Sequence, residues 1–181
     1  TEKGDVLLGG GAKFTSQNST WETDHGRGDD VLLNSFEFNP QVGVFIVDRL
    51  VFGVEVPIAY SSKETDYGTY SSTATSIVPF MRYYFDSDRY QLKTYLHGGV
   101  GLGSVSDKFD SGTGPYPDPD SAELFLYDLS CGLAVFLNEK VSLDIGLGYT
   151  SRSVKPKQGN DSNYVRISSG FASSIGFVFV L

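Results

Sequence analysis

The chain alternates apolar and polar residues over long stretches. In FEFNPQVGVFIVDRLVFGVEVPIAY, residues 36–60, every second residue is apolar on both sides of Asp48-Arg49. The positions between them are polar or small and include Glu37, Asn39, Gln41, Gly43 and Glu55. A period of two predicts β-strands with one apolar face. That face either packs in a dry core or faces lipid.

The same alternation predicts eight strands, whose connections fall into two classes. The strands are expected over residues 5–15, 33–47, 50–61, 74–86, 89–106, 123–137, 140–154 and 163–181. Tight turns at 48–49, 87–88 and 138–139 alternate with longer connections around 16–32, 62–73, 107–122 and 155–162. In an up-and-down meander, the tight turns then share one end with both termini. Short turns opposite long loops, with an even strand number, are typical of transmembrane β-barrels.

Side-chain size indicates which face points outward. The apolar face carries bulky residues, among them Phe38, Val54, Met81, Leu92, Leu133, Leu143 and Phe171. The interior of an eight-stranded barrel is too narrow for so many large side chains. A soluble, lipocalin-like barrel is the alternative, but it would expose a glycine-rich face and require an apolar cargo. We therefore predict one domain over residues 1–181, an all-β, eight-stranded antiparallel up-and-down transmembrane β-barrel.

The opposite face carries charges that nearly balance. Besides Lys13, the predicted ion-pair network of the lumen comprises Glu37, Glu55, Arg82, Lys93, Asp128, Asp144, Arg152 and Arg166. Counting residues from the turns predicts a lower cluster of Glu55, Arg82, Lys93 and Asp144, and an upper cluster of Glu37, Asp128, Arg152 and Arg166. Buried charges are costly unless they are paired. We favour a salt-bridged plug over a polar ion path, because eight strands leave little free bore.

Composition narrows the function. The net charge of −8 argues against nucleic acid as a partner. One cysteine excludes a zinc–cysteine site, and no cofactor or metal site is predicted. His97 faces inward and is interpreted as a hydrogen-bonded interior histidine, while His25 lies in the first long connection. No spaced nucleophile motif occurs, so we do not expect an enzyme.

The long connections and the strand ends carry further signals. Acidic residues crowd the connections: Glu22, Asp24, Asp29, Asp30, Glu64, Asp66, Asp107, Asp110, Asp118, Asp120 and Asp161. Two aromatic girdles are expected. The loop-side girdle comprises Trp21, Tyr60, Phe125, Tyr127, Tyr149 and Tyr164, and the turn-side girdle Phe52, Phe85, Tyr90, Phe177 and Phe179. Pro40, Pro57 and Pro79 fall inside predicted strands, where bulges or lumen water would have to replace a lost hydrogen bond.

Three segments resemble a known family. NPQVGVFIVDRLVFGVEV and VPFMRYYF are similar to the Pro-x-x-Gly-aromatic hairpin and the Pro-Phe-x-Arg-Tyr-Tyr strand of small eight-stranded outer-membrane β-barrels of Gram-negative bacteria. That family includes outer-membrane proteins X and W and the membrane domain of outer-membrane protein A. The C-terminus resembles its sorting signal, through Ser174, Gly176, Phe179 and Leu181, with leucine in place of the final aromatic residue.

The resemblance implies a mature protein of the bacterial outer membrane, with both termini periplasmic and long loops extracellular. The expected partners are outer-membrane lipid and lipopolysaccharide, the barrel-assembly machinery during insertion, and other outer-membrane proteins. Because the family hosts several functions, the fold does not select one. We expect a scaffold with acidic extracellular loops, for envelope integrity or as an accessory subunit of a larger complex. A passage for small apolar solutes is the alternative, and an outer-membrane lipid-modifying enzyme comes third.

Overall fold

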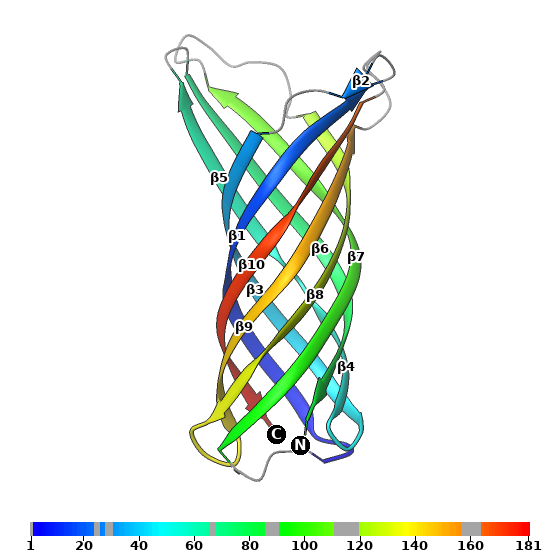
Figure 1. The fold of residues 1–181 in the computed structure, drawn as a ribbon, viewed down its shortest axis with the longest axis vertical. Coiled ribbons are helices and arrows are strands. Elements are labelled where there is room, and N and C mark those ends of the chain that lie inside the picture. Colours follow the sequence, from blue (N-terminus) through cyan, green and yellow to red (C-terminus); the bar gives the residue numbers. More distant parts are fainter. Residues whose placement is uncertain are drawn as a thin grey trace.

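Figure 1 shows a cylinder of tilted strands with both ends of the chain at the same end of the cylinder. This computed structural model describes the backbone of residues 2–23, 26–27, 31–65, 68–85, 91–110, 120–156 and 164–181, and the side chains of 2–15, 35–61, 71–85, 91–106, 121–155 and 165–181. Its strands are β1 (Val6–Thr23), β2 (Gly26–Arg27), β3 (Val31–Val47), β4 (Leu50–Glu55), β5 (Ile58–Thr65), β6 (Gly68–Tyr84), β7 (Leu92–Asp110), β8 (Asp120–Phe136), β9 (Val141–Pro156) and β10 (Tyr164–Val180). Within these residues, no helix is long and apolar enough to cross a membrane.

The sheet closes on itself. Strand β1 pairs antiparallel with both β10 and β3, so the first and last strands join. Strands β4 and β5 both lie between β3 and β6 and form the two halves of one barrel strand. Strand β2 only extends the edge of β1 by two residue pairs. The predicted closed, eight-stranded antiparallel barrel is therefore confirmed.

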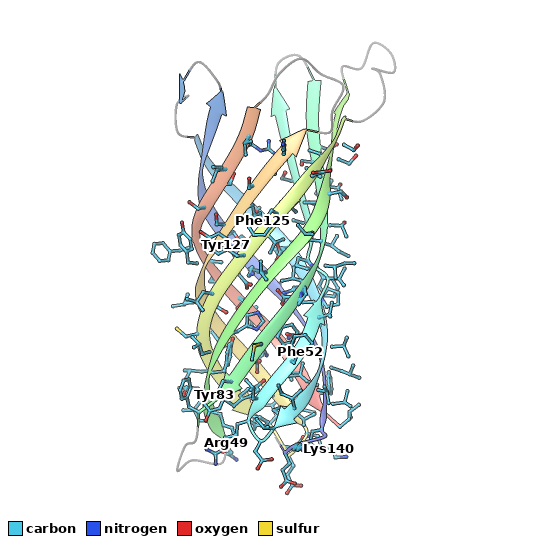
Figure 2. The ribbon with its side chains drawn as sticks, turned by 90° about the vertical axis from the view of Figure 1, so that its right-hand side faces the viewer. Arg49, Phe52, Tyr83, Phe125, Tyr127 and Lys140 are labelled. Carbon is cyan, nitrogen blue, oxygen red and sulfur yellow. The ribbon has the colours of Figure 1, made fainter. Side chains whose placement is uncertain are left out.

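The tight turns gather at the end that holds both termini. Asp48 and Arg49 join β3 to β4, and Arg49 adopts a positive φ of 69°. Residues 137–140 join β8 to β9 at the same end, which Arg49 and Lys140 mark in Figure 2. The two termini are joined at this end, because the Val6 amide donates a hydrogen bond of 2.9 Å to the Leu181 carbonyl. Two of the three predicted turns are thus confirmed, and residues 87–88 lie outside the described residues.

The strands extend farther toward the loops than the sequence predicted. Much of the long connection expected at 16–32 is strand, since β1 continues to Thr23. Both described ends of the connection expected at 107–122 are strand as well, and β7 pairs with β8 as far as Asp107 and Asp120. These extensions are mostly polar, with Ser-Gln-Asn-Ser-Thr in β1 and Asp-Lys-Phe-Asp in β7, and their backbones continue the ladder although no apolar alternation marks them. A strand of 17 residues is roughly 56 Å long at 3.3 Å per residue. The barrel therefore rises well beyond the roughly 9–11 residues per strand that a bilayer requires.

An apolar belt surrounds the turn-side part of the barrel. Phe38, Met81 and Phe171 expose 52%, 50% and 79% of their surface, which confirms the predicted outward face. Phe125 and Tyr127 lie toward the loops, and Phe52 lies toward the turns (Figure 2). The other exposed aromatic residues of the two predicted girdles are Tyr60, Phe85, Tyr149, Phe177 and Phe179. The side chains of Trp21, Tyr90 and Tyr164 lie outside the described set.

The three prolines interrupt the ladder without shifting it. Gln41 pairs with Glu55 and Phe38 with Ile58, so the register is unchanged on both sides of Pro57. Pro40 still accepts a hydrogen bond of 2.9 Å from the Val56 amide, although it has no N–H to return. The expected bulges are therefore absent at Pro40 and Pro57, and each proline costs the barrel only its own donor.

Candidate functional site

The lumen contains large apolar side chains at its turn end, which the sequence analysis did not place there. This turn-side apolar layer consists of Leu7, Phe45, Val51, Phe80, Tyr84, Tyr95, Ala134, Phe136, Val178 and Val180. The alternation along the chain predicts charges and polar or small residues on the inward face. That description is incomplete, because the inward positions of β3, β6 and β7 also carry aromatic residues.

Glycines on facing strands make room for these rings. A Cβ added to Gly53 would lie 2.6 Å from the Phe80 ring. Gly132 and Gly146 are paired across β8 and β9, and a Cβ at either would lie 2.5–2.7 Å from the Tyr95 hydroxyl. The narrow bore thus accommodates a few large rings because the facing strands carry no side chain at these positions.

Directly above this layer lies a group of connected polar side chains, the polar centre, which consists of Gln41, Glu55, Arg82, His97, Asp128 and Asp144. Arg82 of β6 is the residue nearest the layer, with its guanidinium over the Phe80 and Tyr95 rings. Its Nη1 lies 2.9 Å from Asp144 Oδ2, across the lumen on β9. Nη2 donates to Gln41 Oε1 at 3.0 Å, and Nε donates to His97 Nδ1 at 3.3 Å. The guanidinium also stacks over the Tyr95 ring at 4.8 Å. These contacts satisfy the buried cation from three other strands, β3, β7 and β9, as a charge in a closed lumen requires.

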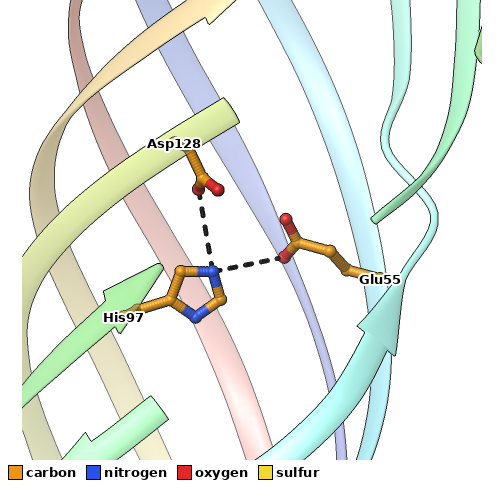
Figure 3. A group of neighbouring side chains, drawn as sticks. All are labelled: Glu55, His97 and Asp128. Atoms are coloured by element: carbon orange, nitrogen blue, oxygen red, sulfur yellow. Dashed lines mark ion pairs between the residues drawn. The ribbon is translucent and has the colours of Figure 1, made fainter. Parts of the chain in front are cut away.

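Glu55, His97 and Asp128 meet at one point of the polar centre (Figure 3). They come from β4, β7 and β8, and each is at most 6% exposed. His97 Nε2 lies 3.8 Å from Glu55 Oε2 and 3.6 Å from Asp128 Oδ2. These three residues form the lumen triad.

A second group of charges lies beside the lumen triad. Lys13 Nζ is 3.3 Å from Asp128 Oδ2 and 3.9 Å from Glu37 Oε1. Glu37 also pairs with Arg152, from the opposite side of the barrel. The ion pairs therefore connect β1, β3, β8 and β9 across the bore.

The structure regroups the charges that the sequence placed in two clusters. Arg82 and Asp144 meet as expected, and so do Glu37 and Arg152. Glu55, assigned to the lower cluster, instead approaches Asp128 of the upper one through His97. Residue counting along single strands failed here because tilt and shear offset neighbouring strands by different amounts.

Two further members of the predicted network lie apart from the polar centre. Lys93 lies nearer the turns, with Nζ 5.4 Å from the centre of the Phe136 ring. Arg166 lies on β10, where it is partly buried and pairs with Val154 of β9. Asn39 and Gln41 line the cavity of the polar centre as well. Their alternation with outward apolar residues on β3 placed them on the inward face, but the predicted network included only charged residues.

The polar centre has unmet hydrogen-bond acceptors. Glu55 Oε1, Asp128 Oδ1 and Asn39 Oδ1 are buried and have no hydrogen-bond partner. They border a cavity of about 50 Å³, which the lumen triad also lines. A buried acceptor without a donor costs about 1–3 kcal/mol. The cavity therefore has the chemistry of a site for a hydrogen-bond donor or a cation.

The C-terminal residues of the predicted sorting signal lie on β10 and just after it. Gly176 faces the lumen beside Gly11, and Ser174 lines the cavity. Phe179 and Leu181 are exposed at the turn end. Their role as a sorting signal stays a prediction.

A closed β-barrel with an apolar outer belt and a charged, filled lumen defines a small integral outer-membrane protein. The family described as outer membrane protein beta-barrel domain matches residues 1–179, and the chain belongs to this family. The family suggests the bacterial outer membrane as its location. Comparison with curated proteins gives no match.

Solved structures share the fold at low sequence identity. Neisserial surface protein A is 17% identical, with a TM-score of 0.60 over 98% of this chain and 99% of that one. The outer membrane protein OprG from Pseudomonas aeruginosa is 13% identical, with a TM-score of 0.58 over 99% and 97%. Ail, the attachment invasion locus protein of Yersinia pestis, is also 13% identical, with a TM-score of 0.52 over 99% of each chain. These likenesses concern the fold alone.

Proposed function

We propose that this protein is a closed outer-membrane scaffold that displays acidic loops, for envelope integrity or as an accessory subunit of a larger outer-membrane complex. The filled lumen is the observation that carries the proposal. The Arg82–Asp144 ion pair crosses the bore at 2.9 Å, and the turn-side apolar layer blocks the bore below it. The cavity of about 50 Å³ beside the lumen triad has room for only a few water molecules.

Ion conduction through this lumen would require two costly changes. A passing ion would have to separate buried charge pairs, and each charge left without its partner would lose several kcal/mol of stabilisation. The ion would then have to pass Phe45, Phe80 and Tyr84, which offer little compensation for its hydration shell. A scaffold does not require either change.

Planar-bilayer recording tests the closed state. The refolded barrel should give no stable conductance steps, while a general porin in the same bilayer gives them. The Arg82→Ala/Asp144→Ala double variant removes both charges of the central pair and shows whether the apolar layer alone blocks ions. Regular steps from the unaltered barrel would contradict the scaffold proposal and favour a channel.

The same proposal includes an orientation of the barrel in the outer membrane. Tight turns and termini would lie in the periplasm, and the loops would lie outside the cell, as the alternation of short and long connections suggests. Lys140→Cys at a tight turn should stay unlabelled by an impermeant maleimide in intact cells, whereas a cysteine placed in 111–119 should be labelled. The reverse labelling would invert the orientation.

The acidic loops and the apolar belt suggest partners that copurification can identify. Lipopolysaccharide, the barrel-assembly machinery during insertion and other outer-membrane proteins are the partners we propose. Purification from native membranes in mild detergent should retain at least one of them in a fixed ratio. A protein recovered only as a lipid-free monomer would argue against the accessory-subunit role.

A second apolar layer favours one alternative function. Val78, Val105, Leu124 and Leu126 lie inside the lumen on the loop side of the polar centre. This loop-side apolar layer could accept a small apolar solute that leaves sideways into the membrane, above the charges. Uptake of an apolar dye by proteoliposomes, with and without Leu124→Asp, separates this passage from the scaffold.

A further inference from the structure

The lumen triad combines ligand atoms that transition-metal ions prefer. One imidazole nitrogen and two carboxylate oxygens, each from a different strand, all lie within 4.8 Å of one another. All three side chains are buried, so the group is not an ordinary crowd of solvated surface acids. Imidazole with carboxylate suits Zn²⁺ and its neighbours, whereas Ca²⁺ and Mg²⁺ favour oxygen alone.

The unmet acceptors point to a cation independently of the residue types. Glu55 and Asp128 each have one buried oxygen without a hydrogen-bond partner, and Asn39 Oδ1 beside them has none either. Around them, the carboxylates Glu37, Asp128 and Asp144 contact the cations Lys13, Arg82 and Arg152. Glu55 instead lies against His97, and its Oε2 accepts a hydrogen bond of 2.7 Å from Asn39 Nδ2. Among the ion pairs of this group, Glu55 thus has no lysine or arginine partner, and a bound cation would supply the missing positive charge.

The separations suit coordination after a small adjustment. Tetrahedral Zn²⁺ at about 2.0–2.1 Å from its ligands places neighbouring ligand atoms roughly 3.4 Å apart. His97 Nε2 lies 3.6 Å from Asp128 Oδ2 and 3.8 Å from Glu55 Oε2. Closing these two gaps takes a few tenths of an ångström. The two carboxylate oxygens, which lie within 4.8 Å of each other, would also have to approach. The adjoining cavity of about 50 Å³ gives space for a water ligand.

From this geometry we infer that the lumen triad is a binding site for a divalent transition-metal ion of the Zn²⁺ type. The ion would tie β4, β7 and β8 together at the centre of the barrel. This inference does not depend on the scaffold proposal, because a closed or a conducting barrel could hold such an ion. Two basic neighbours, Arg82 and Lys13, would have to change their contacts with the triad when the metal ion binds.

Arg82 and Lys13 oppose the metal in different ways. Arg82 Nε donates to His97 Nδ1, which places the imidazole proton on Nε2, facing the carboxylates. Metal at Nε2 requires the other tautomer, with the proton on Nδ1. Lys13 Nζ lies 3.3 Å from Asp128 Oδ2, the oxygen that the metal would use. Metal binding should therefore shift the His97 tautomer and displace Lys13 from Asp128.

The first experiment uses the unaltered chain refolded in detergent with Zn²⁺ or with a chelator, followed by desalting. The expected result is one tightly held Zn²⁺ per barrel. The chain has only two histidines, so ¹⁵N-histidine labelling resolves His97 once His25→Gln removes the other. The His97 spectrum should change from the Nε2-protonated tautomer to a metal-bound Nε2 with a protonated Nδ1.

Variants distinguish Zn²⁺ binding at the lumen triad from Zn²⁺ binding by acidic residues elsewhere in the chain. Glu55→Gln, His97→Gln and Asp128→Asn should each weaken Zn²⁺ binding by at least about tenfold. Glu123→Gln, at an exposed position of β8, should leave binding unchanged. Lys13→Met should strengthen binding, because it removes the competing ammonium group. A merely structural role for Lys13 would not produce that gain.

Clear outcomes overturn the inference. If the His97 nitrogen resonances do not respond to Zn²⁺ in the unaltered lumen, the triad does not bind the ion. The same conclusion follows if Zn²⁺ binds equally to His97→Gln, since the acidic connections then hold it. Should a triad variant fail to refold, as shown by its heat-modifiable mobility, the tautomer measurement on the unaltered triad still decides.

Discussion

Arg82 and Asp144 form an ion pair of 2.9 Å although three strand-to-strand steps separate β6 from β9 around the barrel. The pair therefore crosses the bore instead of following the sheet. Ser142 Oγ donates to the second oxygen of Asp144 at 2.8 Å, so both oxygens of this carboxylate are satisfied. The backbone ladder fixes the strands side by side, and this contact joins opposite walls.

Breaking the central pair should be costly. Arg82→Ala would leave Asp144 as a buried, uncompensated charge and should lower the free energy of unfolding by about 3–5 kcal/mol. Urea titration monitored by heat-modifiable mobility measures the loss. Lys140→Ala, at an exposed turn, is the control and should change the stability little. The Arg82→Ala/Asp144→Ala double variant should lose less than the sum of the single variants, and strict additivity would refute the coupling.

A charge on the outer belt should destabilise the barrel according to its depth. Leu147 is 68% exposed on β9 and pairs with Cys131 within the belt. Leu147→Arg should cost about 2–4 kcal/mol in a bilayer, because arginine near the midplane must leave water. Leu137 is 61% exposed at the β8–β9 turn, and Leu137→Arg should cost about 0–1 kcal/mol. Equal losses for the two variants would contradict the outward assignment of the belt.

The packing of rings over glycines also gives a matched pair of variants. Gly53→Ala would place its Cβ 2.6 Å from the Phe80 ring and closer still to the Val42 carbonyl oxygen, whereas the nearest atom to a Cβ at Gly98 is 3.6 Å away. Overpacking should cost Gly53→Ala about 1–3 kcal/mol, and Gly98→Ala should be tolerated. Phe80→Leu should recover part of the Gly53→Ala loss. The same urea titration measures all three, and the absence of any recovery would show that the Phe80 ring is not the obstacle.

A cross-strand aromatic pair should contribute to the loop-side edge of the belt. The rings of Tyr149 and Phe171 are paired in register and meet edge to face, with centroids 6.1 Å apart. A double-mutant cycle with Tyr149→Leu and Phe171→Leu should give a coupling energy of about 0.5–1.5 kcal/mol. Replacing Tyr149 together with the distant Phe52 should give none.

The sequence alone predicted the strands, the closure and the two faces of this protein. These features follow from a period of two and from side-chain volume, both of which are local properties. The strand ends near Thr23 and Asp110 were missed because mostly polar segments continue a ladder there without an apolar pattern. The rings of Phe80 and Tyr95 inside the lumen were missed because their space comes from Gly53, Gly132 and Gly146 on other strands.

Only the tertiary structure decided which charges meet. The alternation placed Glu55, His97 and Asp128 on the inward face, but they come from three strands and are separated by 42 and 31 residues in sequence. Their heights in the barrel depend on strand tilt and on the shear of the closed sheet, which no single strand encodes. The sequence therefore determined that the lumen is charged, and the closure of the barrel determined that these three side chains converge on one cavity.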